Sequence, residues 1–228
     1  MKLETQCLHA GYSPESTTNA CAVPLYKTSS FVFNNTEHAA NLFGLRELGN
    51  IYTRLMNPTT DVLEQRVTAM EGGAAGLGVA SGTSAVFYSI INLAQEGDEI
   101  ISANNLYGGT YTQFNDILPK FGIKVKFVDP NDPANFAAAI TDKTKAIFCE
   151  SVSNPGLDVA DIKAIANVAD DHGIPLIVDS TFSTPYLTNP IEHGASIVIH
   201  SLTKWMGGHG NGIGGIVVDS GTFNWKNG

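Results

Sequence analysis

Beyond the first fifty or so residues, hydrophobic and polar positions follow regular patterns. Pro58 stands where the first turn of a helix tolerates proline. Leu63, Val67 and Met70 recur at a spacing that puts them on one helical face, and Gly72 begins a glycine pair that ends the pattern. The spacing therefore predicts a helix that begins at Pro58 and ends before the glycines.

Strand and helix patterns alternate from there to the end of the chain. Short apolar runs typical of buried parallel strands occur at residues 75–80, 99–102, 125–128, 146–150, 175–179 and 196–200. Helical patterns lie between them at 84–94, 110–120, 135–140, 159–172 and 191–193, and a last strand is expected at 215–218. This alternation predicts an α/β fold in which helices flank a mostly parallel sheet. Ligands bind such sheets where strands end and helices begin.

The first fifty residues lack a clean period and mix polar turns with short apolar pieces. We interpret them as an extended arm with one helix around residues 38–48. The predicted division is an N-terminal arm at residues 1–56 and a large domain at 57–228.

Composition and charge narrow the classes of partner. The chain has 228 residues, and its 43% hydrophobic content supports an ordinary buried core. Because 13 basic residues stand against 22 acidic ones, nucleic acid and anionic membranes are poor partners. No segment approaches the roughly 20 apolar residues that span a bilayer. Three cysteines without zinc-ligand spacing favour a reducing compartment and predict no metal site, so we expect a cytoplasmic protein.

Three loops that follow predicted strands concentrate polar residues. They are Ser81-Gly82-Thr83-Ser84, Asp179-Ser180-Thr181 and His200-Ser201-Leu202-Thr203-Lys204. A Ser-Gly-Thr sequence that opens a helix can hold an anion through free backbone N–H groups, although simple N-capping is the commoner use. An aspartate at the end of a buried strand is likewise often only a cap.

Lys204 has unusual neighbours for a surface lysine, although an exposed lysine remains an equal alternative when it is taken alone. It follows an apolar strand and precedes Trp205 and several glycines. Burial beside apolar groups would lower the pKa of its amine, and a neutral amine is required for Schiff-base formation. A pyridoxal-phosphate (PLP) site needs such a lysine, a carboxylate opposite the pyridine nitrogen, and phosphate donors. Asp179 fits the role of the carboxylate, so the three loops together predict a PLP site.

A series of motifs adds a family resemblance that covers essentially the whole chain. In order, the motifs are Tyr52-Thr53-Arg54, Asn57-Pro58-Thr59, Glu71-Gly72-Gly73, Ser81-Gly82, Glu150-Ser151-Val152-Ser153-Asn154-Pro155, Asp179-Ser180-Thr181 and Ser201-Leu202-Thr203-Lys204. With them the chain resembles the Cys/Met-metabolism PLP enzyme family. The resemblance implies the PLP-dependent transferase fold of the aspartate-aminotransferase type.

The resemblance also implies roles for single residues. Lys204 would hold the cofactor covalently and move protons, Asp179 would pair with the pyridine nitrogen, and Tyr107 would stack on the ring and assist proton transfer. Asn154 would lie near the ring hydroxyl. The remaining implied cofactor contacts are the backbone of Gly82 and Thr83, the hydroxyls of Ser201 and Thr203, and the side chain of Thr181, which would pack near the ring.

The resemblance has two further implications, one for the oligomeric assembly and one for the C-terminal domain. In the family, the pair that corresponds to Tyr52 and Arg54 reaches the phosphate of a neighbouring subunit, so a homo-oligomer, usually a homotetramer, is expected. Guanidinium gives bidentate phosphate contact. The family also has a smaller C-terminal domain that supplies an arginine for the substrate carboxylate, and we expect that domain to be absent from this chain.

Within the family, the stretch from Thr36 to Pro58 resembles O-acetylhomoserine sulfhydrylases. The implied activity is that of a transferase in methionine and cysteine biosynthesis by transsulfuration. Its reaction is γ-replacement, in which O-acetyl-L-homoserine and sulfide or a thiol give homocysteine or its thioether and acetate. The alternatives are γ-elimination, of the methionine γ-lyase or cystathionine γ-lyase type, and a noncatalytic PLP-binding fragment. A nucleotide-binding protein is disfavoured because neither GxGxxG nor GxxxxGK[ST] occurs. The acyl group and the sulfur donor stay open.

Overall fold

The computed structural model describes residues 1–227 and separates the chain into two compact units. The first comprises residues 1–69, and the second begins at residue 70. The sequence division at residues 56 and 57 rests on motif and pattern, and it stays a prediction. The last residue of the chain, Gly228, lies outside the described residues.

The first unit contains two short helices and most of a longer one. Helix α1 spans Leu3–His9 and was not predicted, because seven residues carry too little periodic signal. Helix α2 spans Thr36–Phe43, where the Asn35 side chain accepts a hydrogen bond from the backbone N–H of His38. It ends before Gly44 and does not extend to residue 48. Helix α3, Pro58–Glu71, follows the predicted pattern.

The Asn-Pro-Thr motif at the start of α3 joins this helix to the arm. Asn57 accepts a hydrogen bond from the backbone N–H of Thr59 at 2.9 Å, and its amide donates to the carbonyl of Tyr26 at 2.9 Å. The hydroxyl of Thr59 donates to the carbonyl of Pro24 at 2.7 Å. The segment before α3 is thus fixed to the start of this helix by side-chain to backbone hydrogen bonds.

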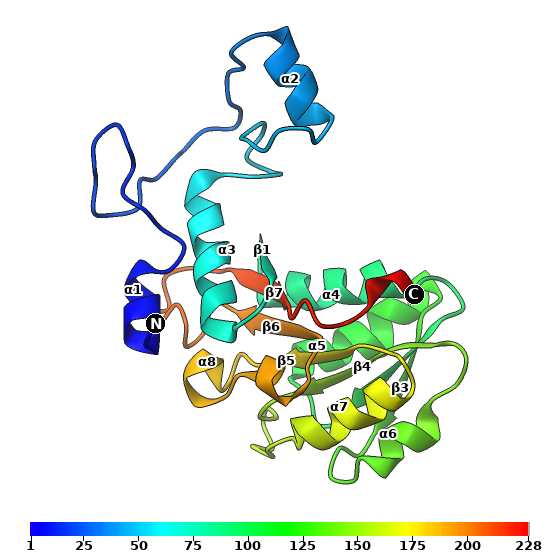
Figure 1. Cartoon of the computed structure of the whole chain (residues 1–228). Helices are drawn as coiled ribbons and strands as arrows, with labels where there is room; N and C mark the ends of the chain where they lie inside the picture. The colour runs from blue at the N-terminus through cyan, green and yellow to red at the C-terminus, as the bar shows by residue number, and fades with distance from the viewer. Residues whose placement is uncertain (228) are drawn as a thin grey trace. The chain divides into compact units, whose positions relative to one another are not determined.

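A seven-stranded sheet forms the centre of the second unit (Figure 1). Its strand order is β1-β7-β6-β5-β4-β2-β3. The strands are β1 (Ala75–Val79), β2 (Glu99–Ala103), β3 (Lys124–Val128), β4 (Thr144–Glu150), β5 (Leu176–Asp179), β6 (Ile197–Ser201) and β7 (Gly215–Asp219). The five neighbouring strands β6, β5, β4, β2 and β3 pair in parallel. This pairing confirms the mostly parallel α/β sheet.

Strand β1 differs from the sequence prediction in its pairing and burial. It hydrogen-bonds to β7 in antiparallel fashion, and β7 is also antiparallel to β6. As an edge strand it is only partly covered, and Leu77 is 56% exposed. The prediction of a buried, parallel-paired strand is therefore wrong at this position, because an apolar run alone does not distinguish a central strand from an edge strand.

Helices cover both faces of the sheet, with α4 on one face and α6 and α7 on the other (Figure 1). Their bounds are α4 Gly82–Leu93, α5 Gly108–Thr112, α6 Ala134–Ala139, α7 Ile162–Asp171 and α8 Thr184–Leu187. The predicted helix at 110–120 is divided, because a π-helical turn at Gln113–Ile117 and a 3₁₀ turn at Leu118–Phe121 continue α5. A 3₁₀ turn at Pro190–His193 replaces the predicted helix there, and the four-residue α8 was not predicted.

The core of this unit lies between the sheet and its helices. The rings of Phe114 and Phe148 meet edge to face with centroids 5.0 Å apart, and both side chains are fully buried. Cys149, in strand β4, is also buried. Burial of one such aromatic or aliphatic side chain stabilises a fold by roughly 1.5–3 kcal/mol, so these contacts fix the strands whose ends carry the polar loops.

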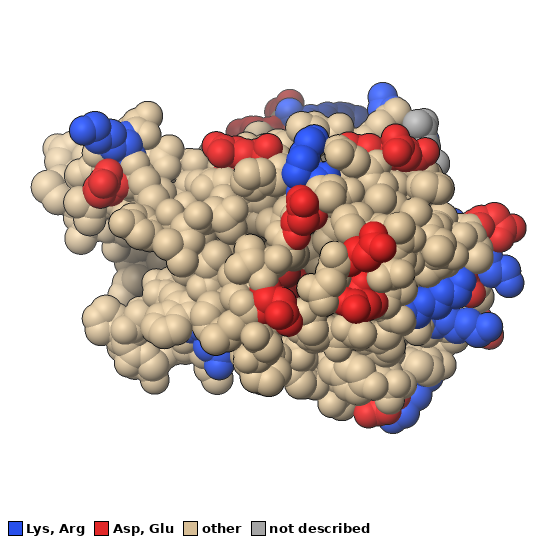
Figure 2. Space-filling model, turned by 90° about the horizontal axis from the view of Figure 1, so that it is seen from below, with Lys and Arg blue, Asp and Glu red and all other residues tan. Residues whose placement is uncertain are grey.

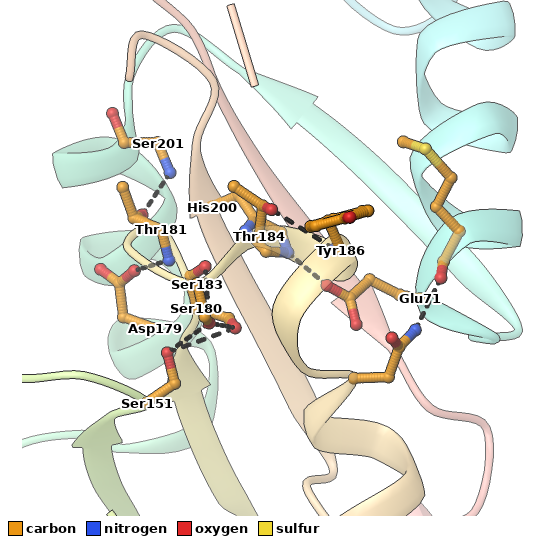
Figure 3. Close-up of polar contacts among 12 residues, drawn as sticks. Glu71, Ser151, Asp179, Ser180, Thr181, Ser183, Thr184, Tyr186, His200 and Ser201 are labelled. Carbon is orange, nitrogen blue, oxygen red and sulfur yellow. Dashed lines mark hydrogen bonds and ion pairs between the residues drawn. The ribbon is translucent and has the colours of Figure 1, made fainter. Parts of the chain in front are cut away.

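A polar pair is enclosed in this otherwise apolar region. Nε2 of His200, on β6, lies 2.5 Å from Oε1 of Glu71, at the end of α3, and both side chains are fully buried (Figure 3). Each group gives the other a hydrogen-bonding partner that burial would otherwise remove. The pair therefore ties the Glu71-Gly72-Gly73 motif to the strand that precedes Ser201.

Basic and acidic side chains are interspersed on the face shown in Figure 2, without an extended basic area. None of the helices described within residues 1–227 is long and apolar enough to cross a membrane.

Candidate active site

A cavity of about 590 Å³ lies where the carboxyl ends of the strands meet the helices that follow them. This volume is in the range of small-molecule sites. The cavity brings together nine residues that the sequence predicted for the site, namely Gly82, Thr83, Tyr107, Asn154, Asp179, Thr181, Ser201, Thr203 and Lys204. Residues separated by more than a hundred positions thus share one chamber within the second unit.

The N-terminus of α4 supplies backbone donors to this cavity. Ser81 caps the helix, and its hydroxyl accepts a hydrogen bond from the N–H of Ser84 at 3.1 Å. N–H groups in the first turn of a helix have no partner within the helix, and Gly82 and Thr83 occupy that turn. Together with the helix dipole, these donors favour an anion such as phosphate.

Gly82 allows α4 to approach strand β6. A Cβ atom at this position would lie 2.5 Å from Cβ of Ser201, closer than packed atoms approach. Only a residue without a side chain therefore lets the helix terminus and the Ser201 loop border the same cavity.

Asp179, Thr181 and Ser201 form a hydrogen-bonded series across the ends of β5 and β6 (Figure 3). The N–H of Thr181 donates to Oδ1 of Asp179 at 3.0 Å, and the N–H of Ser201 donates to the hydroxyl of Thr181 at 2.7 Å. Burial raises the pKa of Asp179, while hydrogen bonds from Thr181 and the charge of His200 oppose that rise. A cation placed against this carboxyl would favour its ionised form.

Three serine hydroxyls support the loop that carries Asp179 and Thr181 (Figure 3). The hydroxyl of Ser183 lies 2.8 Å from the hydroxyls of both Ser151 and Ser180. All three side chains are buried, so each depends on the others for hydrogen bonding. This cluster joins the residues after β4 to those after β5 and limits the movement of the loop.

Lys204 lies in the turn that follows β6 and is exposed. Of the two alternatives that the sequence left equal, the structure has the exposed lysine, because the chain leaves the sheet at Ser201 and Trp205 is itself 64% exposed. The hydroxyl of Thr203 lies 3.3 Å from the carbonyl oxygen and 3.1 Å from the N–H of Gly214. Thr203 thus closes the glycine-rich loop that carries the lysine.

Tyr107 and Asn154 border the cavity from the loops after β2 and β4, and Glu150 contacts both. Oε1 of Glu150 accepts the N–H of Tyr107 at 2.7 Å, and Oε2 accepts the N–H of Asn154 at 3.2 Å. Burial and the neighbouring Asp179 carboxyl raise the pKa of Glu150 to about 8, although both N–H groups oppose the shift. The sequence contained a signal for this residue, because a carboxylate ends an otherwise apolar strand.

Tyr52 and Arg54 belong to the first unit, so their predicted part in the site remains a prediction. The Arg54 guanidinium lies 5.4 Å from the centroid of the Tyr52 ring, a cation–π distance. This contact pairs the two side chains of the Tyr-x-Arg motif with each other.

The donor set of the cavity fits PLP. It offers an anion-binding helix terminus, a carboxyl group, a lysine amine and an aromatic ring, which match the phosphate, pyridine nitrogen, aldehyde and ring face of the cofactor. Among residues 1–227, no group of three or more His, Cys, Asp and Glu side chains is placed to hold a metal ion.

Comparison with known proteins assigns the family. The model of the Cys/Met metabolism PLP-dependent enzyme family matches residues 4–228. The chain therefore belongs to this family of PLP-dependent enzymes.

Several curated relatives are similar over the whole chain. An O-acetyl-L-homoserine sulfhydrylase of Leptospira meyeri is 57% identical over 227 residues, which are 100% of this chain and 51% of that protein. A homocysteine synthase of Schizosaccharomyces pombe is 53% identical, with 98% of this chain and 52% of that protein covered. The chain thus spans about half the length of the curated relatives it matches.

Solved structures show the same fold. A candidate O-acetylhomoserine (thiol)-lyase of Campylobacter jejuni, solved with N'-pyridoxyl-lysine-5'-monophosphate, has a TM-score of 0.94 and 44% identity over 96% of this chain and 54% of its own. A cystathionine γ-lyase of Lactobacillus plantarum, complexed with L-serine, has a TM-score of 0.89 and 39% identity over 96% of this chain and 55% of its own. The fold is therefore that of PLP-dependent lyases and transferases.

Proposed function

We propose that this chain is the cofactor-binding part of an O-acetylhomoserine sulfhydrylase, a PLP-dependent transferase of methionine biosynthesis. The reaction is γ-replacement, in which the acetate group of O-acetyl-L-homoserine is exchanged for sulfide or a small thiol. The observation that carries this proposal is the single cavity that combines Lys204, Asp179 and the N-terminus of α4. Relatives at 52–57% identity that bear the sulfhydrylase name support the choice of substrate.

The proposed cofactor contacts follow from the chemistry of each group. Of the residues that line the cavity, Lys204 would hold PLP covalently, Asp179 would pair with the ring nitrogen, and Tyr107 would stack on the ring. Backbone N–H groups of Gly82 and Thr83 bind the phosphate. The other proposed contacts are Asn154 near the ring hydroxyl, Thr181 near the ring, and the hydroxyls of Ser201 and Thr203 at the phosphate.

Proton transfer is the main task of the protein's own side chains. When bound, PLP supplies a ring that accepts the electron pair released as a bond at the substrate Cα breaks. The amine of Lys204 would remove the proton from the substrate Cα, release it, and then remove one from Cβ, so that the C–O bond at Cγ breaks and acetate leaves. The sulfur nucleophile would then form the C–S bond at Cγ, and protons would return to Cβ and Cα. The Tyr107 phenol, beside the same cavity, assists these transfers, and the Asp179 carboxylate holds a proton at the ring nitrogen.

The proposed assembly is a homo-oligomer, in the family pattern a homotetramer, in which Tyr52 and Arg54 reach the phosphate of a neighbouring subunit. An arm that the Asn57 side chain holds by a hydrogen bond to the carbonyl of Tyr26, and in which Tyr52 and Arg54 lie together, supports this proposal. We also propose a cytoplasmic location, which an odd number of three cysteines without close spacing in the sequence favours.

Product analysis tests the reaction. The chain is incubated with PLP, O-acetyl-L-homoserine and sulfide, and homocysteine and acetate are expected. Lys204→Ala should lower the rate by at least about 100-fold, because it removes the proton-transferring amine. Lys145→Ala, which changes an exposed lysine on β4 outside the cavity, should have no effect.

Two results would contradict γ-replacement. Formation of an α-keto acid and ammonia in place of homocysteine would indicate γ-elimination, the activity type of the Lactobacillus plantarum neighbour. Absorbance of bound PLP without either product would indicate a noncatalytic cofactor-binding chain.

A further inference from the structure

Glu150 ends β4 and forms part of the wall between two cavities. Its side chain borders the large cavity with Lys204 and also a smaller polar cavity of about 100 Å³, which Asn105 and Asp158 line. Only 7% of Glu150 is exposed. A carboxyl group in such a place requires hydrogen-bonding partners, and the partners it has lie on loops of the larger cavity.

The two oxygens of Glu150 divide their contacts between two loops. Oε1 accepts the backbone N–H of Tyr107, in the loop between β2 and α5. Oε2 accepts the backbone N–H of Asn154, in the loop after β4. The second loop is closed independently, because the N–H of Ser153 donates to the carbonyl of Asp158 at 2.9 Å. Glu150 therefore ties both loops to the end of the strand, beside the hydrogen bond of 3.1 Å from the Asn105 amide to Asp158 that joins the two loops directly.

Strand register places Glu150 beside Asp179. The two residues are direct partners in the parallel pairing of β4 and β5, so their side chains lie on the same face of the sheet. Two ionised carboxylates on neighbouring strands in direct register would repel each other in a partly buried site. The other titratable groups that line the two cavities with them are Lys204, Tyr107, Cys149, Asp158 and Asp161.

We propose that Glu150 is a positioning residue that holds Tyr107 and Asn154 at the cofactor ring while it carries a proton and adds no charge beside Asp179. The inference rests on the proposed function, in which these two residues contact PLP. Glu150 itself takes no part in covalent chemistry in this proposal. A raised pKa of about 8, caused by burial and by Asp179, agrees with a protonated side chain at neutral pH.

The substitution Glu150→Gln distinguishes a residue that positions two loops from one that only fills buried space. Both oxygens of a protonated carboxyl can accept an N–H, whereas an amide has one accepting oxygen and a nitrogen that can only donate. Glu150→Gln preserves size and neutrality but must release one of the two loops. Because the contact at Asn154 is longer than that at Tyr107, we expect Asn154 to be released.

Amide hydrogen exchange measures the positioning without cofactor. In Glu150→Gln, the Asn154 N–H should exchange about tenfold faster or more than in the unmodified chain, and that of Tyr107 should change less. Glu150→Ala should accelerate both. The matched control is Glu99→Gln, because Glu99 is 8% exposed and bound by Lys126 and Thr141 away from the cavity. Unchanged exchange at Tyr107 and Asn154 in both Glu150 variants would overturn the proposal.

Titration with PLP measures the consequence for the site. Glu150→Gln should raise the PLP dissociation constant about tenfold and alter the circular dichroism of the bound cofactor, whereas Glu99→Gln should do neither. Faster exchange with unchanged affinity and spectrum would refute a link between Glu150 and the cofactor. If the unmodified chain binds no PLP, the proposed function fails, and the exchange result still decides whether Glu150 holds the two loops.

Discussion

The carboxyl groups of Glu150 and Asp179 are neighbours whose surroundings favour different protonation states. Both end parallel strands at the cavity, and burial raises the pKa of each. Asp179 is hydrogen-bonded by Thr181 and lies within the field of His200, which favour its ionised form. Glu150 has Asp179 itself as a neighbour, which favours its protonated form.

A pH dependence of stability follows from Glu150. Its pKa rises from 4.5 to about 8 on folding, so between these values the folded chain holds a proton that the unfolded chain has released. The free energy of unfolding therefore decreases as pH rises from 4.5 to 8, by at most about 1.4 kcal/mol per pH unit for this group. Glu150→Gln should remove the decrease in unfolding free energy that Glu150 causes, while the decrease caused by Asp179 remains.

Urea denaturation at several pH values between about 5 and 8 checks this expectation. The difference in unfolding free energy between the Glu150→Gln variant and the unmodified chain should grow in favour of the variant as pH rises. Parallel curves for the two proteins across this range would show that Glu150 titrates near its ordinary pKa.

Single residues were predictable from sequence where their type and place were both unusual. Asp179 stood out as a carboxylate at the end of an apolar strand, and the structure turns it into the cavity. Glu150 carried the same signal but received no role, because its task depends on backbone N–H groups that a sequence does not show. The sequence left burial and exposure of Lys204 equally open, because its exposure depends on the direction of the chain after Ser201.

At the scale of elements, the approach of α4 to β6 forms the anion-binding end of the cavity. Gly82 begins the helix beside Ser201, and Gly215 begins β7 at a point where a Cβ atom would overlap the carbonyl oxygen of Ser81. These glycines let three chain segments meet without side chains between them. The helix terminus is therefore positioned by backbone packing.

Gly82→Ala tests this packing. Its Cβ would overlap Ser201, so we expect a loss of about 1–3 kcal/mol in unfolding free energy and weaker PLP binding. Gly108→Ala is the matched control, because Gly108 also begins a helix but a Cβ there meets no atom within 4 Å. Urea denaturation should separate the two variants, and equal stability and PLP affinity would contradict a tight helix–strand contact.

Regular elements were predictable because their hydrophobic period is long or their strands are fully covered. Helix α3 and the central strands β4 to β6 have such patterns. The four-residue α8 and the divided helix after Tyr107 do not, since each is set by local capping and packing. The partly exposed β1 could not be told from a central strand, because its composition is equally apolar.

For the whole molecule, the sheet order explains why distant motifs meet. β4 lies between β2 and β5, and β6 lies beyond β5, so loops after four adjacent parallel strands share one edge of the sheet. Tyr107, Asn154 and Lys204 come from the loops after β2, β4 and β6, and Asp179 ends β5. The alternation of strands and helices predicted that the site lies where strands end and helices begin. The strand order and the place of β7 came only from the structure.

Covalent labelling tests the central claim most directly. The purified chain is mixed with PLP, its absorbance is recorded, and the sample is reduced with borohydride and mapped by mass spectrometry. We expect one major pyridoxyl adduct, on Lys204. An adduct on another lysine, or none in a demonstrably folded sample, would contradict the assignment of this cavity as the PLP site.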